Sequence, residues 1–292
     1  MMRLEKTLTY KLPTKKVNGD MNKMKKILLG TLLLIIILAA ITFIININTS
    51  STDENETRLL FSNHYMSAAL EEEETIPFNI FALNDPDSPK NFDGEPVTDV
   101  SLNNETIEIV DYTIDAGMTD EGYQLINFIL TLTVNGSEIE KADKLSLFFE
   151  DGETLTYDIG EVVLTTYSVT EDLEQVGENT TAYPEPSLDV HLDNTRDQAI
   201  ELISISDTGD VISYDFNQHD TIAEEDTYHL VIDRLHTENM YDFYTITPLL
   251  TYEMGEERKS YVMDPVLYGI LDQDEVKVRK ILSHNGIPIQ ED

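Results

Sequence analysis

The sequence contains no cysteine and no tryptophan among its 292 residues. Without cysteine, no disulfide can cross-link the chain and no thiolate can serve as a nucleophile or a metal ligand. The lack of tryptophan weakens the case for carbohydrate binding, which commonly stacks sugar rings on aromatic faces, although 14 tyrosines can substitute. Any folded domain must therefore be stabilised by packed apolar side chains.

Basic residues are also scarce. The chain has 19 Lys and Arg against 56 Asp and Glu, a formal net charge of −37. A surface this negative repels phosphate backbones, so nucleic acid is excluded as a partner of the bulk of the chain. Nucleotide binding is excluded as well, because no Gly-Lys pair and no G-x-G spacing occurs. The acidity is typical of a solvated exterior surface; the alternative is attraction of cations or a basic partner.

One long apolar run stands out near the N-terminus. Residues 27–45 are nineteen consecutive uncharged residues, about 28 Å as a helix at ~1.5 Å per residue, which matches a bilayer core. Residues 1–26 carry eight Lys and Arg against two acidic residues, which predicts a cytoplasmic tail. We expect an uncleaved anchor that binds the lipid bilayer through residues 27–47, because a signal peptide has a shorter apolar core. Met21 and Met24 remain alternative starts.

The rest of the chain is expected outside the cytoplasm. Export without cysteine is typical of a bacterial surface protein, since eukaryotic exported domains commonly use disulfides. Composition and patterning divide this region into an acidic stalk with a short helix over residues 59–70, two β-sandwich modules and a linker. Their expected bounds are 48–75 for the stalk, 76–166 for module 1, 167–186 for the linker and 187–292 for module 2.

From residue 76 onward, apolar residues alternate with polar ones, as in a strand with one buried face. The pattern is clearest in residues 123–136, where Ile126, Phe128, Leu130, Leu132 and Val134 share one face. A slip between Ile109 and Val110 predicts a β-bulge, and Asn135-Gly136 and Asp151-Gly152 are hairpin turn signals.

Other alternating runs begin at Ile76, Glu105, Lys144, Thr154, Leu188, Ala199, Val211, Tyr228, Phe243 and Ser260. We interpret the basic segment at residues 274–286 as a last edge strand; the alternative is that Lys277, Arg279 and Lys280 dock on an acidic neighbour. The expected fold is mainly β, with two tandem antiparallel sandwiches of immunoglobulin-like size.

Module 1 opens with the segment LNNETIEIVDYTI and closes with the hairpin LSLFFEDGETLTY, and these two segments carry a family resemblance. Over residues 97–165 the strand pattern resembles immunoglobulin-like modules that Gram-positive bacteria place behind lipoprotein or membrane anchors. The resemblance implies an extracytoplasmic, non-enzymatic module, and it transfers no functional residue.

Few residues qualify as a site. The segment from Asp85 to Glu95 gathers Asp85, Asp87, Asp93 and Glu95, hard oxygen ligands of the kind that calcium prefers. The alternative is turn chemistry, which favours Asp for local reasons and also explains the clusters at Asp151 and Asp207. The six histidines are expected on the surface, and we identify no catalytic residue and no other cofactor site.

These observations favour a non-enzymatic module at the bacterial cell surface that binds another envelope component or senses the exterior; the expected partner is another envelope protein. Two alternatives stay open: a surface hydrolase with a carboxylate site, and a calcium-stabilised adhesion module.

Overall fold

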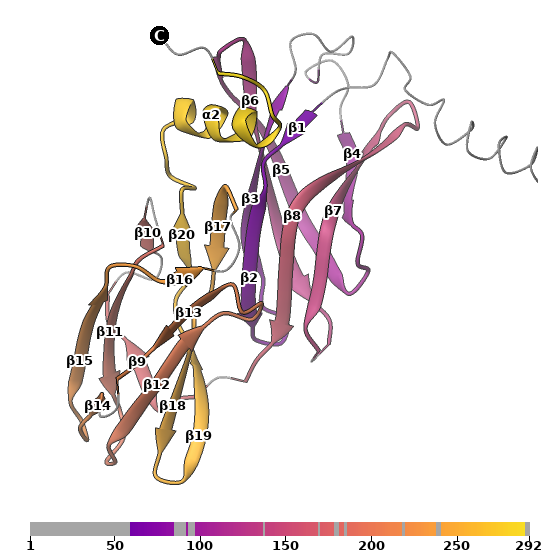
Figure 1. Ribbon diagram of the computed structural model, residues 1–292. Coiled ribbons are helices and arrows are strands. Elements are labelled where there is room, and N and C mark those ends of the chain that lie inside the picture. The colour runs from indigo at the N-terminus through magenta and orange to yellow at the C-terminus, as the bar shows by residue number, and fades with distance from the viewer. Residues whose placement is uncertain are drawn as a thin grey trace, which may run out of the picture. The chain divides into compact units, whose positions relative to one another are not determined.

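A computed structural model describes residues 59–84, 92, 97–136, 138–168, 170–177, 181–183, 186–217, 220–237 and 241–289. The described part is mainly β, with twenty strands and one helix (Figure 1). This confirms the predicted class. The predicted membrane segment 27–47 lies outside the described residues, and among the residues described no helix is long and apolar enough to cross a bilayer.

The first sheet has four antiparallel strands. Its order is β1 (Leu59–Phe61), β3 (Ile76–Asn84), β6 (Tyr123–Val134) and β5 (Ile107–Asp120). The predicted inward face of β6 is confirmed, since its alternate residues from Ile126 to Val134 are all buried. The predicted bulge is confirmed too, because the β5–β6 register shifts between Ile109 and Asp111 and leaves Val110 unpaired and 47% exposed.

The second sheet joins the two halves of the chain. Its seven strands lie in the order β10 (Thr181–Tyr183), β20 (Val266–Tyr268), β17 (Phe243–Ile246), β2 (His64–Leu70), β8 (Thr154–Thr166), β7 (Glu140–Phe149) and β4 (Val97–Leu102). At its centre, β2 is parallel to both β8 and β17. The expectation of purely antiparallel pairing is wrong here, because distant segments meet side by side.

Two smaller sheets complete the second half. One has the order β15 (Thr227–Ile232), β11 (Leu188–Asn194) and β9 (Leu173–Gln175). The other has the order β16 (His236–Thr237), β13 (Ile212–Asp215), β12 (Ile200–Ser206), β18 (Leu249–Met254) and β19 (Glu257–Val262), with β14 (Thr221–Ile222) beside β12. Apolar residues of β11, β12 and β18 share one core between these sheets.

Strand β2 is buried on both faces. Met66, Ala68 and Leu70 belong to the core of the first sandwich, whereas Tyr65 belongs to the core of the second half. The predicted helix over residues 59–70 of the stalk is therefore wrong. A strand covered on both faces shows no alternation of apolar and polar residues, so the sequence HYMSAAL lost the signal on which the prediction depended.

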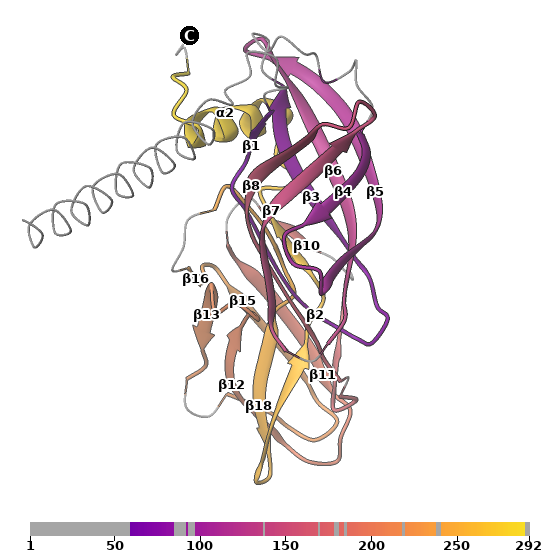
Figure 2. The ribbon, with the colours of Figure 1, turned by 90° about the vertical axis from the view of Figure 1, so that its right-hand side faces the viewer.

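The linker and the last strand also need correction. Residues 167–186 include β9 and β10, which pair in two different sheets. The basic segment forms helix α2 (Asp274–His284), not an edge strand. The buried residues Val278, Ile281 and Leu282 have helical spacing. This periodicity favours a helix over the predicted strand. Helix α2 lies beside β1, where Asn285 Nδ2 donates to Phe61 O over 3.1 Å (Figure 2).

Of the two predicted hairpin turns, one is confirmed. Phe149 and Glu153 close the turn at Asp151-Gly152 between β7 and β8. Asn135-Gly136 instead carries the chain from the first sheet to the second. The tight turn between β5 and β6 is formed by Glu121 (φ 51°) and Gly122 (φ 85°), the two positive φ values of a type I′ turn.

Candidate functional site

The two halves of the chain meet along β2, and several of the buried polar groups lie at this seam. The Tyr65 hydroxyl donates to the Asp207 carboxylate, which also accepts the backbone N–H groups of Gly209, Val211 and Ile212 at 2.9, 2.7 and 2.8 Å. Burial, followed by the charge of Asp207, raises the pKa of Tyr65, so its hydroxyl stays protonated. The turn interpretation of Asp207 is thereby supported, because its oxygens are occupied by its own turn and by Tyr65.

His64 begins β2 and contradicts the expectation that all histidines are exposed. Its ring is fully buried and stacks on Phe243 with 4.8 Å between centroids. Nε2 accepts the backbone N–H of Phe81 over 3.2 Å. Burial lowers the pKa of His64 to about 3, so the imidazole is neutral at ordinary pH.

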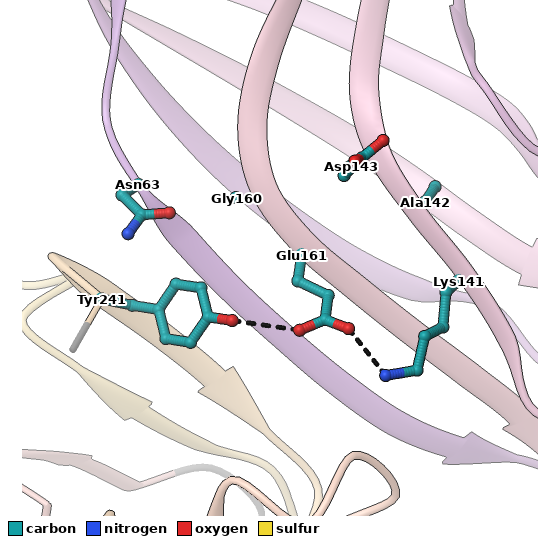
Figure 3. A pocket seen from close by; sticks show the side chains of 7 residues that line it. All are labelled: Asn63, Lys141, Ala142, Asp143, Gly160, Glu161 and Tyr241. Atoms are coloured by element: carbon teal, nitrogen blue, oxygen red, sulfur yellow. Dashed lines mark hydrogen bonds and ion pairs between the residues drawn. The ribbon is translucent and has the colours of Figure 1, made fainter. Parts of the chain in front are cut away.

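One pocket lies where β7, β8 and the start of β2 meet; we call it the β8 pocket. Its volume is about 620 Å³. Figure 3 shows Glu161 between Tyr241 and Lys141, with Asp143 apart from them. The residues that line it are Asn63, Lys141, Ala142, Asp143, Gly160, Glu161 and Tyr241.

The charged groups of the β8 pocket are already paired. Glu161 accepts from Lys141 Nζ at 2.7 Å and from the Tyr241 hydroxyl at 3.0 Å, and Asp143 accepts from Asn103 Nδ2 at 2.7 Å. Burial, then the hydrogen bond to Glu161, raises the pKa of Tyr241 and keeps it a donor. The arrangement offers a solvated, hydrogen-bonding surface instead of an activated base or nucleophile.

A second pocket, of about 360 Å³, lies between the end of β2 and the β19–β20 connection; we call it the seam pocket. Both halves of the chain contribute to its walls, which combine apolar, tyrosine and acidic side chains. The residues that line it are Ala69, Leu70, Glu71, Glu74, Thr75, Ile76, Pro77, Tyr167, Thr170, Thr247, Tyr261, Val262, Met263, Asp264 and Pro265. Its volume lies within the range of small-ligand sites, roughly 300 to 1,000 Å³.

In the segment predicted to be a linker, the buried carboxylate of Asp172 is the centre of an ionic network. Its side chain is 5% exposed and accepts from Arg196 Nε at 2.7 Å, Tyr252 Oη at 2.8 Å and Lys259 Nζ at 2.9 Å. Burial opposes its ionisation, but the hydrogen bonds from Lys259, Tyr252 and Arg196 outweigh it and lower the pKa of Asp172 to about 2.

We expect Asp172→Asn to lower the free energy of unfolding by about 2 kcal/mol at pH 7, because Lys259 and Arg196 lose their common anion. The folded-state pKa lies below the unfolded value of 3.8, so this contribution is present above about pH 4 and disappears as the pH falls towards 2. Urea unfolding followed by tyrosine fluorescence checks both points. Asp197→Asn, a change at an exposed neighbouring residue, is the control. A difference between wild type and Asp172→Asn that persists at pH 2 would contradict the account.

The structure also shows a histidine pair that the sequence did not reveal. His191 and His229 lie directly opposite on β11 and β15, with ring centroids 5.3 Å apart, and His229 Nε2 lies 2.7 Å from Asp189 Oδ1. The predicted position of His191 on the polar face agrees with its partial exposure. Within the residues described, no cluster of three or more His, Asp or Glu has the geometry to hold a metal ion.

The predicted calcium ligands Asp85, Asp87, Asp93 and Glu95 lie outside the described residues. Calcium binding there stays a prediction. The similar cluster at Asp151 is a turn, since Asp151 Oδ1 accepts the backbone N–H of Glu153 over 2.9 Å.

Comparisons with known proteins give no family. No protein-family model matches the sequence, and no curated protein matches it. The chain is similar to solved fibronectin(III)-like modules of Clostridium thermocellum CbhA, with 12% identity, a TM-score of 0.18, and coverage of 74% of this chain and 97% of that one. It is also similar to the major pilin subunit of Bacillus cereus, with 9% identity, a TM-score of 0.22, and coverage of 75% and 68%. A third similar structure is the C-terminal domain of the Streptococcus agalactiae AgI/II polypeptide BspA, with 9% identity, a TM-score of 0.20, and coverage of 71% and 95%. The β-sandwich assignment therefore depends on the sheets themselves.

Proposed function

We propose that the chain is a membrane-anchored, non-enzymatic binding protein of the bacterial cell surface, with immunoglobulin-like modules that bind another envelope protein. The observation that carries the proposal is the shared sheet. Because β2 pairs with strands of both halves, the modules form one continuous body instead of two beads on a flexible linker. A fixed body presents a preorganised surface, which reduces the entropy lost on binding.

The anchor at residues 27–47 and the extracytoplasmic location are part of the same proposal. They are supported by the apolar run, by the basic residues before it and by the acidic surface behind it. The paired charges of the β8 pocket favour binding over catalysis, since Glu161 already contacts Lys141 and Tyr241.

The absence of cysteine permits a direct test of location. Glu150→Cys places one thiol in the exposed β7–β8 turn, and Thr14→Cys places one in the proposed cytoplasmic tail. We expect a membrane-impermeant maleimide to label Glu150→Cys on intact cells and Thr14→Cys only after permeabilisation. The wild-type chain, which has no cysteine, is the control for background labelling. Labelling of both variants only after permeabilisation would exclude a surface location.

Binding is tested on the same cells with a membrane-impermeant amine crosslinker. We expect a discrete adduct that contains this chain and one envelope protein, formed on intact cells. A chain that remains monomeric at its native level of expression would contradict a binding role.

A further inference from the structure

The seam pocket contains a carboxylate that no described residue compensates. Asp264 is half-buried, and its backbone N–H donates to Gln175 Oε1 over 2.8 Å. Its carboxylate forms no hydrogen bond or ion pair with any described residue. Burial raises the pKa of Asp264, and no neighbouring donor or cation lowers it again. Asp172 is the contrast within the same chain, because three donors hold that buried carboxylate in its charged form. A desolvated carboxylate is costly unless a cation or donors meet it.

The pocket also contains a buried hydroxyl without a partner. Thr247 is 4% exposed and lines the pocket, and within the described part of the chain its Oγ1 has no hydrogen-bond partner. Buried polar atoms without a partner are uncommon in folded proteins, and a water, an ion or a ligand group can supply the partner. Thr247 and Asp264 belong to different connections, after β17 and after β19. Two independent groups in one pocket thus lack partners.

The walls define the shape of the missing ligand. Met263, Pro265 and Pro77 supply apolar surface, and the rings of Tyr167 and Tyr261 line the same space. Both tyrosine hydroxyls are engaged: Tyr167 donates to Ser260 O, and Tyr261 accepts the backbone N–H of Gln175 over 3.0 Å. The tyrosines therefore offer the pocket their aromatic rings, and an aromatic ring attracts an organic cation that lies over its face.

Glu71 and Glu74 make the rim negative, and the side chains that line the pocket include no Lys or Arg. Glu74 Oε2 accepts the backbone N–H of Glu71 over 2.7 Å, which fixes the turn between β2 and β3 at the edge of the pocket. A small negative rim around an apolar interior favours a cation that carries an apolar body.

We propose that the seam pocket binds an alkylammonium group, with its nitrogen at Asp264 and Thr247 and its carbon chain along Met263, Pro265 and the tyrosine rings. This deepens the proposed binding function by naming the chemistry that the seam recognises. A bare metal ion is disfavoured, because the described residues offer no cluster of three ligating side chains. The ammonium can come from a free small amine or from a lysine side chain of a protein.

The test uses the full chain in detergent micelles and isothermal titration at pH 7. The two cationic probes are pentylammonium and the peptide acetyl-Gly-Lys-Gly-amide. Their neutral counterparts are 1-pentanol and the same peptide with norleucine. We expect each cationic probe that binds to do so at least tenfold more tightly than its neutral counterpart. Tighter binding of the peptide identifies a lysine side chain as the ligand, and tighter binding of pentylammonium identifies a free amine.

Variants localise the effect. We expect Asp264→Asn to weaken binding at least tenfold and Thr247→Val to weaken it severalfold. Glu72→Gln lies on the same turn but outside the pocket, so it should leave binding unchanged within twofold. Without ligand, Asp264→Asn should melt no lower than the wild type, because it removes an uncompensated charge.

Binding of neither cationic probe, equal binding of the neutral probes, or full binding by Asp264→Asn would overturn the proposal. These results come from purified protein and do not depend on where the chain resides. Failure here is thus distinct from failure of surface labelling or crosslinking on cells.

Discussion

A chain that begins at Thr75 is expected to remain unfolded, whereas one that begins at Thr57 should fold cooperatively. The patterning of the sequence places the first module at residue 76, so Thr75 is where a domain boundary would be drawn from sequence alone. The structure places the buried strands β1 and β2 before that point. Loss of β2 removes the central strand of the seven-stranded sheet, and loss of β1 removes an edge strand of the four-stranded sheet.

The size of the effect follows from burial. Tyr65 and Met66 are fully buried and Leu70 is 3% exposed, and each such side chain contributes about 1.5 to 3 kcal/mol. Three of them alone approach the total stability of an ordinary domain, about 5 to 15 kcal/mol. Their removal also opens β8 and β17 along the edges that β2 covers, leaving unpaired backbone groups in the core.

Far-ultraviolet circular dichroism and urea unfolding followed by tyrosine fluorescence compare the two chains. The Thr57 chain retains both strands and serves as the matched control. We expect a sigmoidal transition for it and none for the Thr75 chain. Equal midpoints for the two would show that β2 is dispensable and that the halves fold separately.

Gly160→Ala is expected to lower the free energy of unfolding by about 3 kcal/mol or more. Gly160 lies within β8, opposite His64 in the parallel pair, and has φ +95°. A Cβ at this position would overlap His64 O and lie 2.6 Å from His64 N. Both are backbone atoms, so no side-chain rotation can relieve the contact.

Gly152→Ala is the matched control for Gly160→Ala. Gly152 has φ +87°, and a Cβ there would meet nothing within 4 Å. It should cost only about 1 to 2 kcal/mol, the ordinary penalty of a left-handed residue with a side chain. The difference between the two variants measures how closely β8 approaches β2. Equal losses of stability, measured by urea unfolding, would mean that the backbones move apart without penalty.

The strands that have one buried face and one solvent-facing face could be predicted from the sequence. In β6 the alternation of apolar and more polar residues identifies the buried residues, and the slip at Val110 identifies the bulge. Strand β2 could not be predicted in this way, since both of its faces are covered and its sequence resembles a helix. Helix α2 could be predicted from the helical spacing of Val278, Ile281 and Leu282. The edge-strand prediction was based on its basic residues instead.

The seam pocket could not be predicted from the sequence, because its residues come from distant parts of the chain. Asp264 and Thr247 are 17 residues apart and meet Ala69 and Pro77 from the other half of the chain. Neither belongs to a motif, and an isolated Asp or Thr carries no signal. Asp172 could be noticed only as one acid in a polar stretch, because its partners Arg196 and Lys259 follow it by 24 and 87 residues.

The parallel pairing of β2 with β17 has a consequence for the order of folding. His64 pairs with Phe243, 179 residues later. During synthesis, β2 emerges long before β17 exists, so the central sheet cannot close until most of the chain has followed. Contacts this distant in sequence slow folding, because the loop must be closed before the contact stabilises it. The halves therefore cannot mature one after the other, and a chain stalled before β17 would expose an apolar strand to chaperones and proteases.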